Sequence, residues 1–282
     1  MVSDISGLKD IGWDSAIDGC PYIATCTERM DLAMTDRKVL LTGATGYIAS
    51  QLLPTFQERY DLTLLDVKEQ DREGNQVPNV AAVDLSHTNR ENYSQHFQGV
   101  DTVVHLGHRW RRGEPLDDFY NESANVVMAY NVYRAAYEAG ARRVVIASSN
   151  HAADWYEHAL IHERDMEVLD PYNLPLSDNF YGWAKATYEH LGFLFACGSL
   201  GRKLQMVMVR IGAAREISLE NFSNDPRGYK RDLGAYISQR DLCQLFTKAI
   251  ETPRIENEHG IPWLVVYGIS DNTRSFWSLT SA

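Results

Sequence analysis

Short apolar runs alternate with segments of helical periodicity along most of the chain. The runs cover residues 37–41, 61–66, 79–84, 100–107 and 143–149, and short, continuous apolar runs of this kind are typical of buried strands. Apolar residues return at helical spacing after residue 50 and again through 117–139, where Gly140 ends the pattern. Strands that alternate with helices predict right-handed crossovers and a parallel sheet covered on both faces. The expected fold is therefore α/β, with a doubly wound, Rossmann-type sheet.

The turn after the first predicted strand carries the pattern Gly43-x-x-Gly46-x-x-Ala49. Gly43 permits a tight turn, Gly46 lets the backbone approach a pyrophosphate, and Ala49 allows close packing of helix on strand. The N-terminus of the following helix supplies free N–H groups and a partial positive charge. A strand, glycine turn and helix in this order predict a dinucleotide site, although the pattern alone also fits a turn that binds nothing.

Two further predicted strands end in an acid. Asp66 lies 23 residues after Gly43, where a carboxylate can accept both hydroxyls of an adenine ribose and repel a 2′-phosphate. This position predicts NAD rather than NADP. Asp84 ends the next strand and can face the adenine edge, but a solvated strand end is the alternative for both acids.

A possible catalytic set lies at the carboxyl ends of the later elements. Ser149 closes the fifth predicted strand, and Tyr181 begins a helix expected to reach about residue 196. Lys185 is four residues further on and shares a helix face with Tyr181. Its ammonium group is expected to lower the pKa of the tyrosine, as a general base requires. A Tyr-x-x-x-Lys spacing by itself equally fits an ordinary pair on a helix surface.

These motifs together resemble the extended short-chain dehydrogenases/reductases, over about residues 37–278. Thr42-Gly43-x-x-Gly46 matches the first motif of that family, and Asp84-Leu85 matches its adenine-side acid. His105-Leu106-Gly107 is similar to its strand end beside the cofactor, and 125–131 to its N-x-x-x-x-x-N helix. The resemblance implies one domain over 36–282, with the cofactor part at about 36–185 and a small C-terminal substrate lobe mainly in 186–282. The NAD contacts that it implies are Gly43, Thr45, Gly46, Tyr47, Ile48, Asp66, Asp84, Leu85, Leu106, Gly107, Asn125, Tyr181, Lys185 and Ile211.

The stretch Ser148-Ser149-Asn150-His151 is unusual within that family. It is similar to the S-S-N-H of uronate dehydrogenases and of NAD-dependent glucose-6-phosphate dehydrogenases of haloarchaea. This likeness implies substrate contacts by Ser149, Asn150, His151 and Arg231, the arginine reaching the distal part of a sugar. A guanidinium fork suits a carboxylate or a phosphate equally, and a loop arginine is the plain alternative. The segment 152–156 departs from the usual glycine-containing turn.

The function implied by the resemblance is oxidation of the C1 hydroxyl of a pyranose, a uronate or a sugar phosphate, to a lactone, with NAD as the cofactor. Tyr181 would remove the proton, Lys185 would lower its pKa and Ser149 would hold the oxygen. A nucleotide-sugar epimerase or dehydratase with tightly bound NAD is a second hypothesis. A regulatory protein that binds NAD is a third.

Two other features could bind ligands or simply belong to the structure. His158 and His162 have a spacing that could hold a metal, but they lack the H-E-x-x-H pattern and the reaction needs no metal, so none is expected. The arginines of the basic stretch 108–112, Arg109, Arg111 and Arg112, could bind an anionic substrate or form a solvated loop.

Composition limits the classes of partner. The chain has 282 residues and a formal net charge of −11, which argues against nucleic-acid and anionic-membrane partners. Its four cysteines (Cys20, Cys26, Cys197, Cys243) lack metal spacing, and no signal pattern or apolar run of about 20 residues is present. A cytoplasmic protein is therefore expected. The resemblance also implies a homodimer formed by helices 117–139 and 181–196, while residues 1–35 form an N-terminal extension expected to be dispensable for catalysis.

Overall fold

The computed structural model describes residues 36–110 and 114–282. The N-terminal extension, two of the cysteines (Cys20 and Cys26) and two of the arginines (Arg111 and Arg112) lie outside the described residues.

The core of the fold is a seven-stranded sheet in which all pairings are parallel. The strand order is β3-β2-β1-β4-β5-β6-β7. The chain adds β2 and β3 on one side of β1 and then adds β4 to β7 on the other side, so the order switches between β1 and β4. Ligands of doubly wound sheets bind at the carboxyl ends of strands at such a switch point. The strands are β1 (Lys38–Thr42), β2 (Asp61–Asp66), β3 (Val80–Ala82), β4 (Thr102–His105), β5 (Arg143–Ser149), β6 (Gln205–Ile211) and β7 (Trp263–Gly268).

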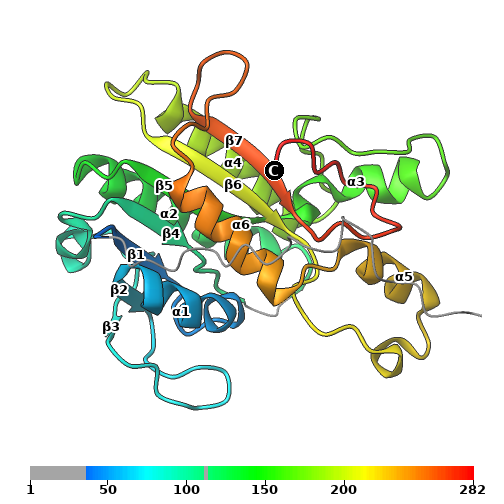
Figure 1. Ribbon diagram of the computed structural model, residues 1–282, viewed down its shortest axis with the longest axis horizontal. Coiled ribbons are helices and arrows are strands. Elements are labelled where there is room, and N and C mark those ends of the chain that lie inside the picture. Colours follow the sequence, from blue (N-terminus) through cyan, green and yellow to red (C-terminus); the bar gives the residue numbers. More distant parts are fainter. Residues whose placement is uncertain (1–35, 111–113) are drawn as a thin grey trace, which may run out of the picture. The chain divides into compact units, whose positions relative to one another are not determined.

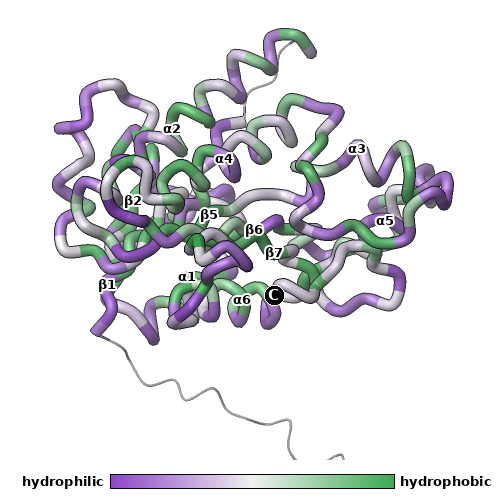
Figure 2. The backbone as a smooth tube through the Cα atoms, turned by 90° about the horizontal axis from the view of Figure 1, so that it is seen from above, coloured by the Kyte–Doolittle hydropathy of each residue, from purple (hydrophilic) through white to green (hydrophobic). Residues whose placement is uncertain are grey.

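Helices cover both faces of this sheet, as predicted (Figures 1 and 2). Helices α1 (Tyr47–Arg59) and α6 (Gln239–Glu251) pack on one face, and α2 (Asp118–Glu138) and α4 (Phe180–Ala196) on the other. Alternate residues of the strands supply the two cores: Leu40 faces α2 and α4, whereas its neighbours Val39 and Leu41 face α1 and α6. This alternation follows from the two-residue period of a strand.

The C-terminal part contributes to the sheet as well as to its edge. Residues 205–211, 239–251 and 263–268 extend the sheet and its helical layer. A third cluster of buried apolar side chains, which includes Ala235 and Trp277, joins α5 (Pro226–Ala235) to the C-terminal segment. Shorter segments are the 3-10 turns Arg90–Asn92, Ser94–Phe97, Asn150–Ala153 (η3) and Leu219–Phe222, the helix α3 (Asp154–Tyr156) and the π-helical turn Glu157–Ile161.

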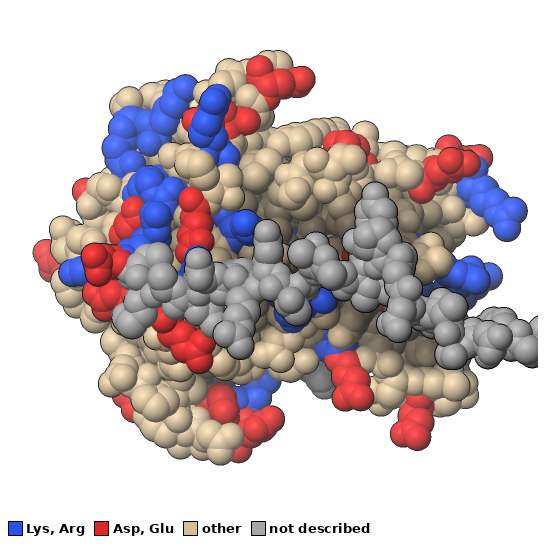
Figure 3. Space-filling model, viewed as in Figure 1, with Lys and Arg blue, Asp and Glu red and all other residues tan. Residues whose placement is uncertain are grey.

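The surface mixes charges of both signs. Figure 3 shows basic side chains interspersed with acidic ones on the face that carries α1 and α6. Within the described part of the chain, every helix is too short or too polar to cross a membrane.

Candidate active site

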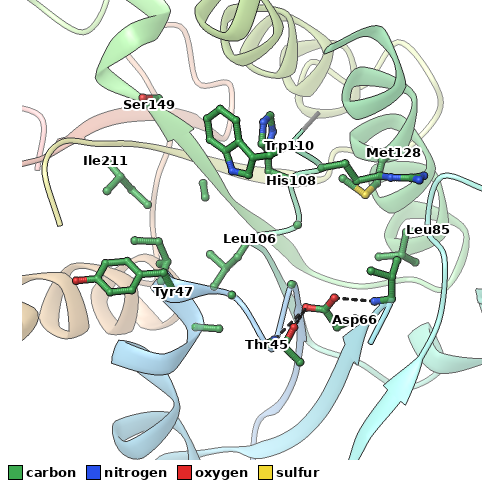
Figure 4. Close-up of a pocket in the computed structure, with 18 of the residues that line it drawn as sticks. Thr45, Tyr47, Asp66, Leu85, Leu106, His108, Trp110, Met128, Ser149 and Ile211 are labelled. Carbon is green, nitrogen blue, oxygen red and sulfur yellow. Dashed lines mark hydrogen bonds between the residues drawn. The ribbon is translucent and has the colours of Figure 1, made fainter. Parts of the chain in front are cut away.

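A cavity of about 670 Å³ lies at the carboxyl ends of the central strands (Figure 4). This volume falls within the range of small-molecule and cofactor sites. The predicted NAD contacts that line it are Gly43, Thr45, Gly46, Tyr47, Ile48, Asp66, Leu85, Leu106, Gly107, Tyr181, Lys185 and Ile211. Ser149 and His151 line the same cavity, so the predicted cofactor turn and the predicted catalytic set face one space.

Gly43 allows two strand-end turns to touch. Its φ is +71°, and a Cβ built there would lie 2.7 Å from the backbone nitrogen of Gly107. A side chain at this position is therefore excluded by both backbone conformation and space. The turns after β1 and β4 meet directly beneath the cavity because neither carries a side chain between them.

Asp66 holds the glycine turn in place. Its Oδ2 accepts hydrogen bonds from the backbone nitrogen and the hydroxyl of Thr45, at 3.0 and 2.8 Å, and its Oδ1 accepts one from the nitrogen of Val67 (Figure 4). A carboxylate has about four acceptor positions. Three of them are used here, so Asp66 supports the turn and keeps about one acceptor position, on Oδ1, for a ribose hydroxyl.

Helix α4 is fixed at its N-terminus against the loop after β5. The Asn179 side chain accepts a hydrogen bond from the nitrogen of Gly182 at 2.8 Å, which is an N-cap. A Cβ on Gly182 would lie 2.0 Å from the carbonyl oxygen of His151. The helix that carries Tyr181 and Lys185 can approach Ser149 and His151 this closely because residue 182 is glycine.

Lys185 and Tyr181 are both largely buried. The Lys185 Nζ donates to the carbonyl oxygen of Ala147 at 2.9 Å and lies 5.5 Å from the centroid of the Tyr181 ring. Burial lowers the pKa of Lys185 to about 8. Burial raises the pKa of Tyr181 to about 12, and a hydrogen bond with Ser149 offsets part of that rise. The prediction that Lys185 brings the tyrosine pKa down is wrong for the protein alone, because desolvation of the phenolate outweighs the favourable contacts.

Two rings of the basic stretch, His108 and Trp110, pack on Tyr181. Trp110 is stacked on the Tyr181 ring at a centroid distance of 5.1 Å, and the His108 ring meets it edge-on at 5.2 Å. His108 is 8% exposed, and its Nε2 lies 3.5 Å from the carboxylate of Glu122. Figure 4 shows both rings side by side at the edge of the cavity. Only the arginines of this stretch were predicted as ligand-binding candidates, whereas the two rings are the side chains that contact the predicted base.

The predicted cofactor contacts Asn125 and Asp84 are not among the residues lining the cavity. Asn125 is fully buried, and its amide binds both backbone groups of Arg109, at 2.8 and 3.1 Å. The Arg109 guanidinium donates to Ser86 and lies 3.6 Å from Asp84. These contacts hold the segment that carries His108 and Trp110 against α2. The structure thus gives Asn125 a positioning role.

The predicted substrate residues lie in different surroundings. Asn150 is buried and does not line the cavity, whereas His151 does, and the Nδ1 of His151 lies 2.5 Å from the Oδ2 of Asp154. The Asp154 side chain is 3% exposed and also accepts a hydrogen bond from Asn179. Asp154 therefore links the cavity histidine to the residue that caps α4.

Arg231 is also absent from the cavity lining. Its Nε donates to both carboxylate oxygens of Glu157, at 3.1 and 3.3 Å, and its Nη1 donates to Asp232 at 3.2 Å. Its Nη2 lies 3.8 Å from Asp154. The guanidinium fork that was expected to reach the substrate is thus occupied by carboxylates of the protein.

His158 and His162 each face a different acid. The Nδ1 of His158 lies 2.6 Å from Asp178, and the Nε2 of His162 lies 3.7 Å from Glu157. In the part of the chain that is described, His, Cys, Asp and Glu do not form a cluster of three that could hold a metal ion.

Three cations of the cavity wall are absent from the sequence prediction. Lys68 and Arg72 lie beyond Asp66, and Arg215 follows β6. They belong to irregular loops, where neither periodicity nor a motif distinguishes them from solvated residues. Their charge and the open N-terminus of α1 at Gly46 suit an anionic group such as a pyrophosphate. The glycine turn, its acid and this charge together fit a dinucleotide.

Comparison with known proteins agrees with this geometry. Residues 39–211, more than half of the chain, match the protein family described as the NAD dependent epimerase/dehydratase family.

Individual relatives are similar over most of their length. The chain is 28% identical to an NAD-dependent glucose-6-phosphate dehydrogenase of Haloferax volcanii, over 88% of this chain and 90% of that protein. It is also 28% identical to a uronate dehydrogenase of Pseudomonas syringae pv. tomato, over 85% of this chain and 77% of that protein. Among solved structures, uronate dehydrogenase from Agrobacterium tumefaciens superposes with a TM-score of 0.65 at 26% identity, covering 88% of this chain and 82% of that one.

Proposed function

Because this chain belongs to the NAD-dependent epimerase/dehydratase family, we propose that it oxidises the C1 hydroxyl of a sugar to a lactone. The chain is an NAD-dependent oxidoreductase, as the relatives named above are. The observation that carries the sugar-oxidation proposal is the convergence of Ser149, Tyr181 and Lys185 on the cavity that begins at the glycine turn. Relatives named for glucose 6-phosphate and for uronates support the reaction class.

In the proposed mechanism, Tyr181 accepts the proton of the C1 hydroxyl and Ser149 orients the oxygen by a hydrogen bond. Lys185 provides positive charge near the phenol ring while its ammonium group is held by the carbonyl of Ala147. Held by the glycine turn and Asp66, oxidised NAD would supply the hydride acceptor for C1 and a positive charge in the cavity. A positive charge there would lower the pKa of Tyr181 from its value of about 12, because it favours the phenolate.

The test is NADH formation from a panel of neutral aldoses, uronates and sugar phosphates, by the wild type and Tyr181→Phe. We expect the variant to lose at least about 100-fold in kcat, as loss of a general base does, while its affinity for NAD changes little. Turnover by Tyr181→Phe at the wild-type rate would overturn the proposal. An epimerase would instead convert a nucleotide sugar with no net NADH, and a regulator would function without Tyr181.

We also propose a homodimer that pairs α2 and α4 with the same helices of a second copy. Tyr120, Val127 and Tyr130 form an exposed stripe on α2, and Trp183 and Leu194 are exposed on α4. Spacings of seven and three residues on α2, and of eleven residues on α4, place each set on one helix face. These side chains therefore point away from the sheet, which supports the proposed pairing. Sedimentation that shows only monomer would contradict it.

A further inference from the structure

The guanidinium of Arg231 lies within a cluster of buried carboxylates. Glu157, Asp232 and Asp154 approach it at 3.1, 3.2 and 3.8 Å, and their side chains are at most 5% exposed. The Arg231 side chain is itself only 18% exposed, and its guanidinium carbon lies 5.8 Å from the centroid of the Trp277 ring. The Nε and Nη1 donors are already used in hydrogen bonds within the protein, and Nη2 is held in an ion pair with Asp154.

The charge of this cluster is unfavourable for an anion. Arg215, which lines the cavity, pairs with Asp232, so two guanidinium groups face three carboxylates. The two histidines in contact with the cluster are His151, beside Asp154, and His162, beside Glu157. The two guanidinium groups and three carboxylates alone give the cluster a net charge of −1. A uronate carboxylate or a phosphate would have to displace Glu157 and then lie beside like charges.

A neutral sugar meets no such repulsion. Sugar hydroxyls are hydrogen-bond donors, and ionised carboxylates only accept. The Oδ1 of Asp154 has no hydrogen-bond partner in the described structure, and the other oxygen of that carboxylate contacts His151, which lines the cavity. Asp154 Oδ1 is buried beside Arg231, so the members of this cluster that can meet a sugar hydroxyl in the cavity are His151 and Arg215.

We propose that the substrate is an electrically neutral aldose and that Glu157 and Asp154 determine this specificity by occupying Arg231. The inference rests on the proposed sugar oxidation. Both acids lie in the segment directly after Ser149, at and beside residues 152–156, where the sequence departs from the turn expected for a uronate or sugar-phosphate enzyme. The segment that departs in sequence is thus the same segment that supplies the carboxylates paired with Arg231.

The first experiment compares substrates that differ only in charge: glucose with glucuronate and glucose 6-phosphate, and galactose with galacturonate. We expect the wild type to prefer the neutral member of each set by at least about tenfold in kcat/KM. In Glu157→Gln this preference should fall several-fold, because the variant removes one negative charge and loosens Arg231. The exposed acid Glu163 of the same segment supplies the control Glu163→Gln, which should keep the wild-type preference.

Calorimetry of the same sugars with the complex of protein and NADH separates this inference from the proposed reaction. If neutral sugars bind in preference to anions but none is oxidised, the reaction is wrong and the charge selectivity stands. If uronates or sugar phosphates are bound or oxidised with a tenfold preference that Arg231→Gln abolishes, the charge selectivity is wrong whatever the reaction. Because the wild type alone gives these outcomes, the test does not depend on the folding of Glu157→Gln.

Discussion

Glu189 of α4 and Arg210 of β6 form a bidentate ion pair in which both side chains are 1% exposed. The Arg210 Nε and Nη2 donate to the two carboxylate oxygens at 2.8 and 2.7 Å. Ser148 of β5 donates to the same carboxylate at 2.7 Å, and the hydroxyl of Tyr267 accepts from Arg210 at 2.9 Å. One pair thus joins three adjacent strands to the helix that carries Tyr181 and Lys185.

We predict that Glu189→Gln lowers the free energy of unfolding by about 3–5 kcal/mol, because it leaves the guanidinium of Arg210 buried without its counter-charge. Urea denaturation measures this loss. Glu138 is the matched control, since its pair with Arg134 is 39% and 46% exposed and Glu138→Gln should cost less than about 1 kcal/mol. Equal losses in the two variants would contradict the prediction.

Gly43→Ala should weaken NAD binding by at least about tenfold, a loss of about 1.4 kcal/mol. The new methyl group collides with the backbone of Gly107, so the turns that form the cavity floor must separate. Gly99 has nearly the same φ, +70°, but open space around it, so Gly99→Ala carries the backbone strain without the collision. Titration of each variant with NAD measures the effect, and similar affinities in both would show that the contact with Gly107 is unimportant.

Gly182→Ala should reduce kcat/KM by about 100-fold, because the methyl group meets the carbonyl of His151 and pushes the start of α4 away from Ser149. Displacements of about 1 Å in an active site have effects of this size. Thr187→Ala changes a hydroxyl on the same helix and should leave turnover nearly unchanged. A fully active Gly182→Ala enzyme would mean that the spacing of α4 and the β5 loop is not critical.

The pH dependence of stability should change in Lys185→Met. A lysine whose pKa falls from 10.5 to about 8 on folding destabilises the native state while it is charged. This penalty is present below pH 8 and disappears as the pH rises towards 10.5, because the unfolded chain then holds more protons than the native protein. The wild type should therefore gain up to about 3 kcal/mol relative to Lys185→Met between these limits. Urea denaturation of both proteins across this pH range measures the difference. If folding left the pKa of Lys185 unchanged, the two curves of stability against pH would run parallel.

Local patterns were sufficient to predict much of the fold. The glycine turn, the acid at the end of β2 and the order of strands and helices follow from residues close together in the chain, and the structure has the parallel sheet and helical layers that they predict. Strands β6 and β7 were not identified as strands by periodicity. Each contains only a short apolar run, 206–209 in β6 and 263–267 in β7, and such runs do not distinguish a buried strand from a buried helix.

The environment of the site residues could not be predicted in the same way. Glu157 and Arg231 are 74 positions apart, and the stacking of Trp110 on Tyr181 also joins distant segments. Contacts of this kind depend on where the fold places each loop. The family resemblance implied that Arg231 contacts the sugar, and no motif marks the carboxylates that surround it in the fold. The pKa of Tyr181 was predicted in the wrong direction for the same reason, since burial is a property of the whole fold.

The double hydrogen bond between Asn125 and the backbone of Arg109 has a consequence for assembly. Helix α2 carries the exposed stripe with Tyr120 and Val127 on its outer side. On its inner side, Asn125 binds the segment that contains His108 and Trp110, whose rings pack on Tyr181. If two copies pair through that stripe, helix α2 connects the dimer contact directly to the wall of the cavity. Dimerisation and the shape of the cavity would then be coupled. A substitution on the outer side of α2 that breaks the dimer would therefore also change KM.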